Sequence, residues 1–165
     1  MILKENFFNH FNTALGALIY IAIFLIGYVW FNFDSAFLCI VGFFLLLDLL
    51  PVIYLHTQYY QENKGQVYEI SNDGILLREN GKSKYFKKTD IDNIKIYMSA
   101  SLYINSSFHY LGIDSYHFAR IILNNQEEII ITCLMWPKVE EAIQVLGGTQ
   151  YRREKIFFCS LDKRL

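Results

Sequence analysis

Charge is nearly absent from the first third of this sequence. The 55 residues from Asn6 to Tyr60 contain only two charged side chains, Asp34 and Asp48, whereas the 105 residues that follow carry 14 Lys plus Arg and 13 Asp plus Glu. Such a contrast is typical of one segment that lies in lipid and another that lies in water. The sequence therefore predicts an apolar N-terminal part, residues 1–60, and a domain of ordinary composition, residues 61–165.

Patterns that mark enzymes, metal centres and nucleic-acid binding are also missing. The sequence has no GxSxG, Walker, HExxH or GxGxxG motif. Its three cysteines, Cys39, Cys133 and Cys159, form neither a disulfide framework nor a CxxC pair. A net charge of -1 provides no basic field for a nucleic acid polymer. We therefore expect a non-enzymatic protein without a catalytic residue, a metal or a cofactor.

The apolar part contains two long runs, at about residues 13–31 and 36–55, separated by the polar stretch 32–35. Each run has 19 or 20 residues, which as an α-helix crosses a hydrocarbon core of about 30 Å. The first run lacks the basic start and the small-residue cleavage site of a signal peptide. Stretches such as Ile19–Ile26 are apolar on every face, which favours lipid over the interior of a soluble protein. The sequence thus predicts a transmembrane helical hairpin.

Positive charge predicts the orientation of this hairpin. No Lys or Arg lies between the two runs, whereas Lys4 precedes them and several basic residues follow: Lys64, Arg78, Lys82, Lys84, Lys87 and Lys88. Because basic residues near a span are retained on the cytoplasmic side, we expect both termini to be cytoplasmic. The lipid bilayer is then the first partner of the chain.

Asp48 is the one ionisable side chain within a predicted span. A charge at the centre of a transmembrane helix costs about 2.5–3.5 kcal/mol, so this carboxyl group needs a partner. If the hairpin turns near Asp34, Tyr20 lies at the same depth and its hydroxyl can donate to Asp48. Two interpretations stay open: a structural hydrogen bond within the hairpin or between chains, and a carboxylate that relays protons or lines a pore.

The remaining sequence has the alternation of short antiparallel strands. Strands are predicted at about 66–70, 75–78, 84–86, 94–98, 116–123 and 128–134, with a hairpin turn at Asn80-Gly81. Apolar residues at helical spacing from Pro137 to Leu146, with Gly147 as a stop, predict a helix that covers the sheet. Residues 151–161 add a last strand or run over the surface.

Two stretches of this domain point to a family. Behind an apolar hairpin, GILLRENGKSKYFKKTDIDNIKIY (74–97) and HFARIILNNQEEIIITCLMWPKVEEAIQVL (117–146) resemble the bacterial PH-like domain proteins. The matching positions are Thr89, Asp90, Ile91 and Ile94, the strand pair around Asn124-Asn125 and the helix at 137–146. The resemblance implies a small, partly open antiparallel β-barrel, or a pair of orthogonal sheets, with a C-terminal capping helix. It also implies a binding or assembly role in a protein of the bacterial cytoplasmic (inner) membrane.

Four lysines form a basic group in the second predicted hairpin: Lys82, Lys84, Lys87 and Lys88. Beside an anionic leaflet each can add about 1 kcal/mol of attraction, and the alternative is an ordinary solvated hairpin. Phosphoinositide-binding PH domains of eukaryotes carry clustered Lys and Arg in the first strand connection, which here reads Ser71-Asn72-Asp73-Gly74. We therefore expect no inositol phosphate recognition of that type.

Two functions stay open at this point. In the first, the hairpin anchors the PH-like domain, which binds another protein, a second copy of the chain or the membrane surface. In the second, the chain resembles in layout the anti-phage effectors that a nucleotide gates, and it oligomerises and permeabilises the membrane. A nucleotide pocket needs a cation and aromatic stacking partners, for which Arg120, Tyr116 and Tyr110 are the candidates.

The distribution of basic residues generates a first prediction. A reporter fused after Leu165 should behave as cytoplasmic, and one inserted at Asp34 as external, because Lys and Arg near the spans are not translocated. Paired reporters that are active only inside or only outside the membrane measure this. A C-terminal reporter found outside would reverse the orientation of the whole chain.

Overall fold

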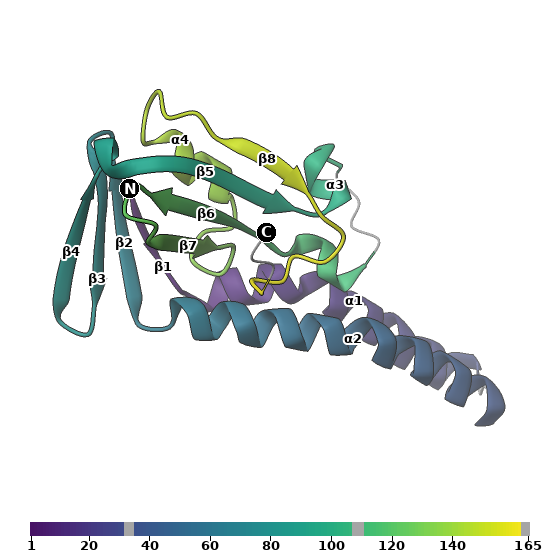
Figure 1. Cartoon of the computed structure of the whole chain (residues 1–165). Coiled ribbons are helices and arrows are strands. Elements are labelled where there is room, and N and C mark those ends of the chain that lie inside the picture. Colours follow the sequence, from purple (N-terminus) through teal and green to yellow (C-terminus); the bar gives the residue numbers. More distant parts are fainter. Residues whose placement is uncertain (32–34, 107–110, 163–165) are drawn as a thin grey trace.

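The computed structural model describes residues 1–31, 35–106 and 111–162. Two long helices, α1 (Phe7–Phe31) and α2 (Ser35–Asn63), form a hairpin that projects from a β-rich body (Figure 1). Both helices extend further toward the body than the predicted runs at 13–31 and 36–55. The polar turn predicted at 32–35 lies mostly outside the described residues.

The first sheet has the strand order β1-β2-β3-β4 and is antiparallel throughout. Its strands are β1 (Ile2–Lys4), β2 (Gln66–Ser71), β3 (Gly74–Glu79) and β4 (Lys82–Lys87). Between β3 and β4, Asn80 and Gly81 have φ values of 50° and 77°, and two positive values are what a type I′ turn requires. The predicted hairpin at Asn80-Gly81 is confirmed.

The helical hairpin is inserted between two neighbouring strands of this sheet. Leu3 of β1 pairs with Tyr68 of β2, and the amino group of Met1 donates to the carbonyl of Ile70 at 2.7 Å. The hairpin is therefore the first strand connection. From the sequence, Ser71–Gly74 is expected to be the first strand connection. This prediction is wrong, because Ser71–Gly74 joins β2 to β3. A strand of three residues is too short to show an alternating pattern.

The second sheet has the order β7-β6-β5-β8. Its strands are β5 (Ile91–Met98), which follows the short helix η1 (Lys88–Asp90), β6 (His117–Leu123), β7 (Glu128–Thr132) and β8 (Arg152–Lys155). The prediction is confirmed in part: the chain has two sheets that do not close into a barrel, but the second sheet is mixed and not antiparallel, because β8 runs parallel to β5. The open edge of β7 meets α2 instead of a strand of the first sheet (Figure 1).

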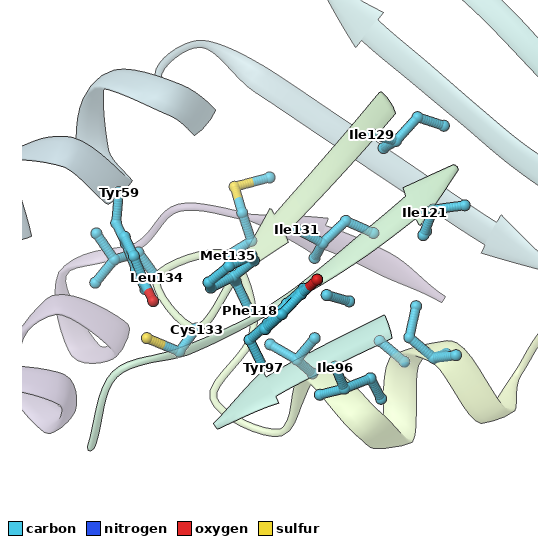
Figure 2. Close-up of a cluster of buried hydrophobic side chains, with 14 of the residues drawn as sticks. Tyr59, Ile96, Tyr97, Phe118, Ile121, Ile129, Ile131, Cys133, Leu134 and Met135 are labelled. Carbon is cyan, nitrogen blue, oxygen red and sulfur yellow. The ribbon is translucent and has the colours of Figure 1, made fainter. Parts of the chain in front are cut away.

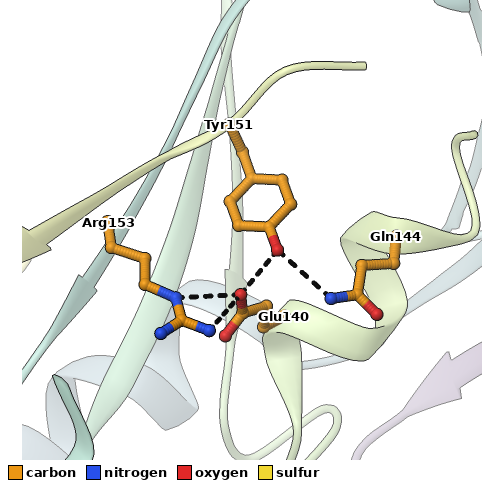
Figure 3. Close-up of polar contacts among 4 residues, drawn as sticks. All are labelled: Glu140, Gln144, Tyr151 and Arg153. Carbon is orange, nitrogen blue, oxygen red and sulfur yellow. Dashed lines mark hydrogen bonds and ion pairs between the residues drawn. The ribbon is translucent and has the colours of Figure 1, made fainter. Parts of the chain in front are cut away.

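Helix α4 (Val139–Gln144) holds β8 in place. The Glu140 carboxylate accepts from the Tyr151 hydroxyl at 2.6 Å and from Nε and Nη2 of Arg153 at 2.9 and 2.7 Å (Figure 3). Gln144 Nε2 donates to the Tyr151 hydroxyl at 3.1 Å. Of the two alternatives for residues 151–161, a last strand is confirmed. The predicted helix at 137–146 is also confirmed, with four fewer residues.

A short helical connection joins β5 to β6. It contains α3 (Ala100–Tyr103) and the short 3-10 helix η2 (Gly112–Ser115). The Ser99 hydroxyl caps α3 by accepting from the Leu102 amide at 3.3 Å, and it donates to the Asp114 carbonyl at 2.8 Å. These two bonds hold both ends of the connection next to the end of β5.

The base of the hairpin belongs to the same core as the strands. Leu55 and Tyr59 of α2 have no exposed surface, and the Tyr59 ring meets Tyr116 and Phe118 edge-on at 5.5 and 6.0 Å. The Tyr59 hydroxyl donates to the Cys159 carbonyl at 2.7 Å. Figure 2 shows Tyr59 beside the apolar side chains of β5, β6 and β7. A division of the chain at residue 60 therefore passes directly beside buried core side chains.

Asn63, the last residue of α2, joins the helix to the exposed edge of β7. Its side chain is fully buried, its Nδ2 donates to the Ile130 carbonyl at 2.8 Å, and its Oδ1 accepts from the Thr132 amide at 3.1 Å. Gly65 follows with φ 75°, the left-handed conformation that ends many helices. The side chain of Asn63 thus takes the place that a neighbouring strand would have.

We predict that Asn63→Leu destabilises the protein far more than Asn93→Leu. The first change keeps the branching of the side chain, with a larger volume, but leaves two backbone groups of β7 unpaired, each at about 1–3 kcal/mol. Asn93 is an exposed residue of β5, so the same change there should cost under about 0.5 kcal/mol. Denaturant unfolding of the full chain in detergent measures both. Equal losses would show that the bonds of Asn63 contribute nothing specific.

Candidate functional site

Polar side chains of α1 and α2 bond to the domain at the junction where the hairpin joins it. On α1, the buried side chain of Asn9 donates from Nδ2 to the carbonyls of Leu134 and Met135, at 2.9 and 3.0 Å. One turn further, the Thr13 hydroxyl lies 3.8 Å from Sγ of Cys133. With Asn63 on α2, these contacts fix both helices to the end of β7 and the loop that follows it. The hairpin is held rigidly and is not a loose tether.

Two histidines and a tyrosine form a hydrogen-bonded chain across the junction. Nδ1 of His10 lies 2.9 Å from Nε2 of His56, and Nδ1 of His56 lies 3.0 Å from the Tyr116 hydroxyl. Burial raises the pKa of Tyr116 above its usual value, so this hydroxyl keeps its proton and can donate to His56. The hydrogen on Nε2 of His56 is then available to His10. Both ring nitrogens of His56 and Nδ1 of His10 therefore have hydrogen-bond partners at the contact with the domain.

Asp48 receives its hydrogen bond from the domain. The backbone amide of Gly112 in η2 donates to Oδ1 at 3.2 Å. The donor expected from the sequence is the Tyr20 hydroxyl. Tyr20 and Asp48 line one hollow of about 260 Å³, together with Leu111. Oδ2 of Asp48 is buried without a hydrogen-bond partner among the described residues. The carboxylate therefore lies at a contact between the hairpin and the β5–β6 connection.

Gly112 is the point of closest approach between η2 and the two helices. A side-chain carbon on Gly112 would lie 2.7 Å from Cγ2 of Val52 and 3.2 Å from Cβ of Ala17. Neither distance is compatible with unaltered packing, so only glycine fits here without a shift of the helices. Small residues allow backbones to approach in this way.

Arg120 lies at a polar hollow between α2 and the second sheet. It is buried, donates to the Leu161 carbonyl at 3.0 Å and lies 5.7 Å from the centre of the Tyr97 ring. The hollow measures about 690 Å³ and is lined by Gln58, Gln61, Glu62, Arg120, Glu128, Ile130, Leu161 and Asp162. Three carboxylates surround one guanidinium, which is unfavourable for a polyanion such as a nucleotide.

The aromatic partners proposed for Arg120 are not at this hollow. Tyr116 faces α2 and contacts His56 and Tyr59, and Tyr110 lies outside the described residues. The rings nearest to Arg120 are those of Tyr97 and Phe118. Both rings belong to the core and stack on each other at 4.9 Å, so they offer no open face for a base.

The four lysines of the basic group do not converge. Lys84 donates to Oε2 of Glu127 at 2.6 Å, and this hydrogen bond lowers the pKa of the Glu127 carboxyl below its ordinary value. Lys88 donates to the carbonyl of Gly147. Lys82 and Lys87 lie at opposite ends of β4. The group lies on the first sheet, at the end of the body away from the hairpin tip (Figure 1).

Beyond the junction the two helices are largely exposed. Each contains a window long and apolar enough to cross a membrane by length and composition, within Phe7–Trp30 and Leu38–Asn63, and only 11% of each window is buried. The exposed side chains are large and apolar; among them are Ile23, Ile26, Trp30, Phe44 and Leu50. No other protein element covers this surface in the part of the chain that the structure describes.

Asp48 could be identified from the sequence, whereas Asn9, Asn63 and Gly112 were not identified as junction residues. Asn9, Thr13 and Ala17 are spaced four apart on α1, a stripe of small and polar side chains that marks a protein-facing side of an apolar helix. That spacing is the signal that could have located the junction. Their partners, such as Leu134, are more than a hundred residues away in the chain and no local pattern connects them.

Comparison with known proteins agrees with this architecture. A PH domain family model matches residues 3–140, a range that includes most of β1, the helical hairpin, the strands from β2 to β7 and the start of α4. No curated protein and no solved structure matches the chain. The match begins within the strand before the hairpin, so the hairpin lies inside the matched range. The chain belongs to the PH domain family.

Proposed function

We propose that the chain is a non-enzymatic membrane protein whose helical hairpin inserts into the bacterial cytoplasmic membrane. The hairpin holds the PH domain on the cytoplasmic side, where the domain binds a protein partner and assembles with it. PH domains are typically binding modules for proteins or lipids, without catalysis. Among the described residues, the cations at the first sheet and at the Arg120 hollow do not converge, which favours a protein over a phosphorylated ligand.

The observation that carries this proposal is that each helix is strongly apolar and yet largely exposed. The helices are the most apolar part of the chain, yet 11% of each apolar window is buried. The core helix of a soluble protein has the opposite property, because its apolar face is covered by other elements. Exposed apolar surface on this scale requires a lipid or protein environment, and length, composition and the lack of charge favour lipid.

The rigid junction adds to this proposal. A domain joined to its anchor by a flexible linker samples many orientations over the bilayer. Here Asn9, Asn63 and Asp48 bond directly to the domain, so one surface of the PH domain always faces the cytoplasm. A fixed orientation suits a module that presents one binding face to a partner.

Membrane integration is tested by extraction. We expect the full chain to stay in the membrane pellet after an alkaline carbonate wash and to leave it only with detergent. The double variant Leu25→Asp, Leu46→Asp should lose this property, because each exposed position would carry a charge costing about 2.5–3.5 kcal/mol in lipid. Tyr85→Asp, also at an exposed apolar residue but on β4, is the matched control. Wild-type protein in the wash supernatant would exclude the proposal.

Asp48→Asn distinguishes the anchored module from a nucleotide-gated pore. Asparagine keeps the Oδ1 acceptor for the Gly112 amide, so we expect the same protein level, integration and thermal stability as in the wild type. A carboxylate that lines a water-filled path would respond differently, since its charge determines conduction. Potential-sensitive dyes and dye entry in overexpressing cells measure this. A depolarising wild type beside an equally abundant, silent Asp48→Asn variant would favour the pore.

A further inference from the structure

Exposed apolar side chains of the domain gather at one end. Outside α1 and α2, the large apolar residues that are exposed in the described part of the chain are Ile2, Tyr85, Tyr103, Ile104, Leu111 and Phe157. Ile2 and Tyr85 lie on the first sheet. The other four, which we call the apolar rim, are 40%, 70%, 38% and 76% exposed in chain order.

The apolar rim lies at the end of the body toward which the hairpin projects. β8 pairs in parallel with β5 so that Lys155 lies opposite Met98, which brings Phe157 to the same end as α3 and Ile104. The bond from Ser99 to Asp114 joins this end to η2. Leu111, just before η2, lines the hollow at Asp48 on the hairpin. Figure 1 shows α3 and the end of β8 on the side toward which the helices project.

Helix geometry gives the depth of this end. His10 is 21 residues from the end of α1, and His56 is 21 residues from the start of α2, so both lie about 31 Å from the hairpin tip. A hydrocarbon core is about 30 Å thick, which places the His10–His56 pair at the near boundary when the tip is at the far one. Asp48 is 13 residues from Ser35, about 20 Å from the tip. The Asp48–Gly112 contact then lies about 11 Å inside the near boundary.

We propose that the apolar rim inserts into the leaflet that the hairpin enters, at the boundary between head groups and acyl chains. The inference rests on the proposed membrane function. Apolar side chains that lie at an interface reach about 5–10 Å into this layer, and the depth of about 11 Å at Asp48 places the neighbouring Leu111 at the inner limit of that layer. Tyr103 suits the interface because its ring is amphipathic, and the neighbouring exposed Lys155 can meet anionic head groups.

The occupant of the rim is lipid because the rim continues the apolar surface of the hairpin. Leu111 lines the same hollow as Phe44 and Leu45 of α2, so apolar side chains of the rim and of the helix adjoin at this point. A partner protein on the rim would have to occupy the space beside the projecting helices that the bilayer fills. Insertion would add a second, domain-borne membrane contact to the hairpin.

Environment-sensitive labels test this arrangement in the full chain. In a Cys39→Ser background, Ile104→Cys, Phe157→Cys and Tyr85→Cys are labelled with the fluorophore NBD and reconstituted into phosphatidylcholine–phosphatidylglycerol vesicles. Cys133 and Cys159 are each 1% exposed and should not react. We expect blue-shifted emission at 104 and 157, strong quenching by lipids with a nitroxide near the head group, and water-like emission at 85.

NBD on the native Cys39, in α2, reports insertion of the hairpin independently. Quenching at Cys39 by lipid nitroxides with water-like emission at 104 and 157 would overturn the rim proposal and leave the membrane function intact. No quenching at Cys39 would overturn the membrane function itself. Blue-shifted emission at 104 and 157 without lipid quenching would mean that protein, such as a second copy of the chain, covers the rim, which also overturns the proposal.

Discussion

The bonds between Asn63 and β7 determine how the two halves of this molecule are related. One buried amide accepts from the Thr132 N–H and donates to the Ile130 carbonyl, so the edge of the second sheet is satisfied by a helix end. An unpaired sheet edge attracts another strand, and here that place is already taken. The edge of β7 therefore pairs with no strand of the first sheet, and the two sheets remain separate. The direction of α2 relative to β7 is set by the same contact.

Much of the fold could be predicted because its signals are local. Long apolar runs predict α1 and α2, alternation predicts the strands from β2 to β7, and Asn80-Gly81 predicts one turn with its type. β1 could not be predicted, since its three residues acquire their structure only by pairing with β2 across the inserted hairpin. The parallel pairing of β8 likewise depends on α4, whose Glu140 binds Tyr151 and Arg153.

At the candidate site, the need for a hydrogen bond can be predicted from local sequence, but the residue that provides it cannot. That Asp48 needs a partner follows from the cost of a charge in an apolar helix, and this requirement is met by a hydrogen bond. The donor, Gly112, is 64 residues away and is a backbone group, so no side-chain pattern points to it. Arg120 was a reasonable candidate for a cationic site from residue type alone. Its environment, with Glu62, Glu128 and Asp162 at the same hollow, reverses that expectation.

The rigid junction also decides which surface can meet a partner in the proposed membrane arrangement. Asn63 is seven residues beyond His56, so it lies about 10 Å outside the near boundary, and β2 of the first sheet begins only after that point. Charges further from the bilayer than the Debye length, about 8 Å at physiological salt, are largely screened from it. The lysines of β4 therefore contribute little to lipid attraction, and they protect an edge strand from pairing with other chains. In the proposed arrangement the apolar rim and the hairpin face lipid, which would leave the first sheet as the surface most freely presented to a protein partner.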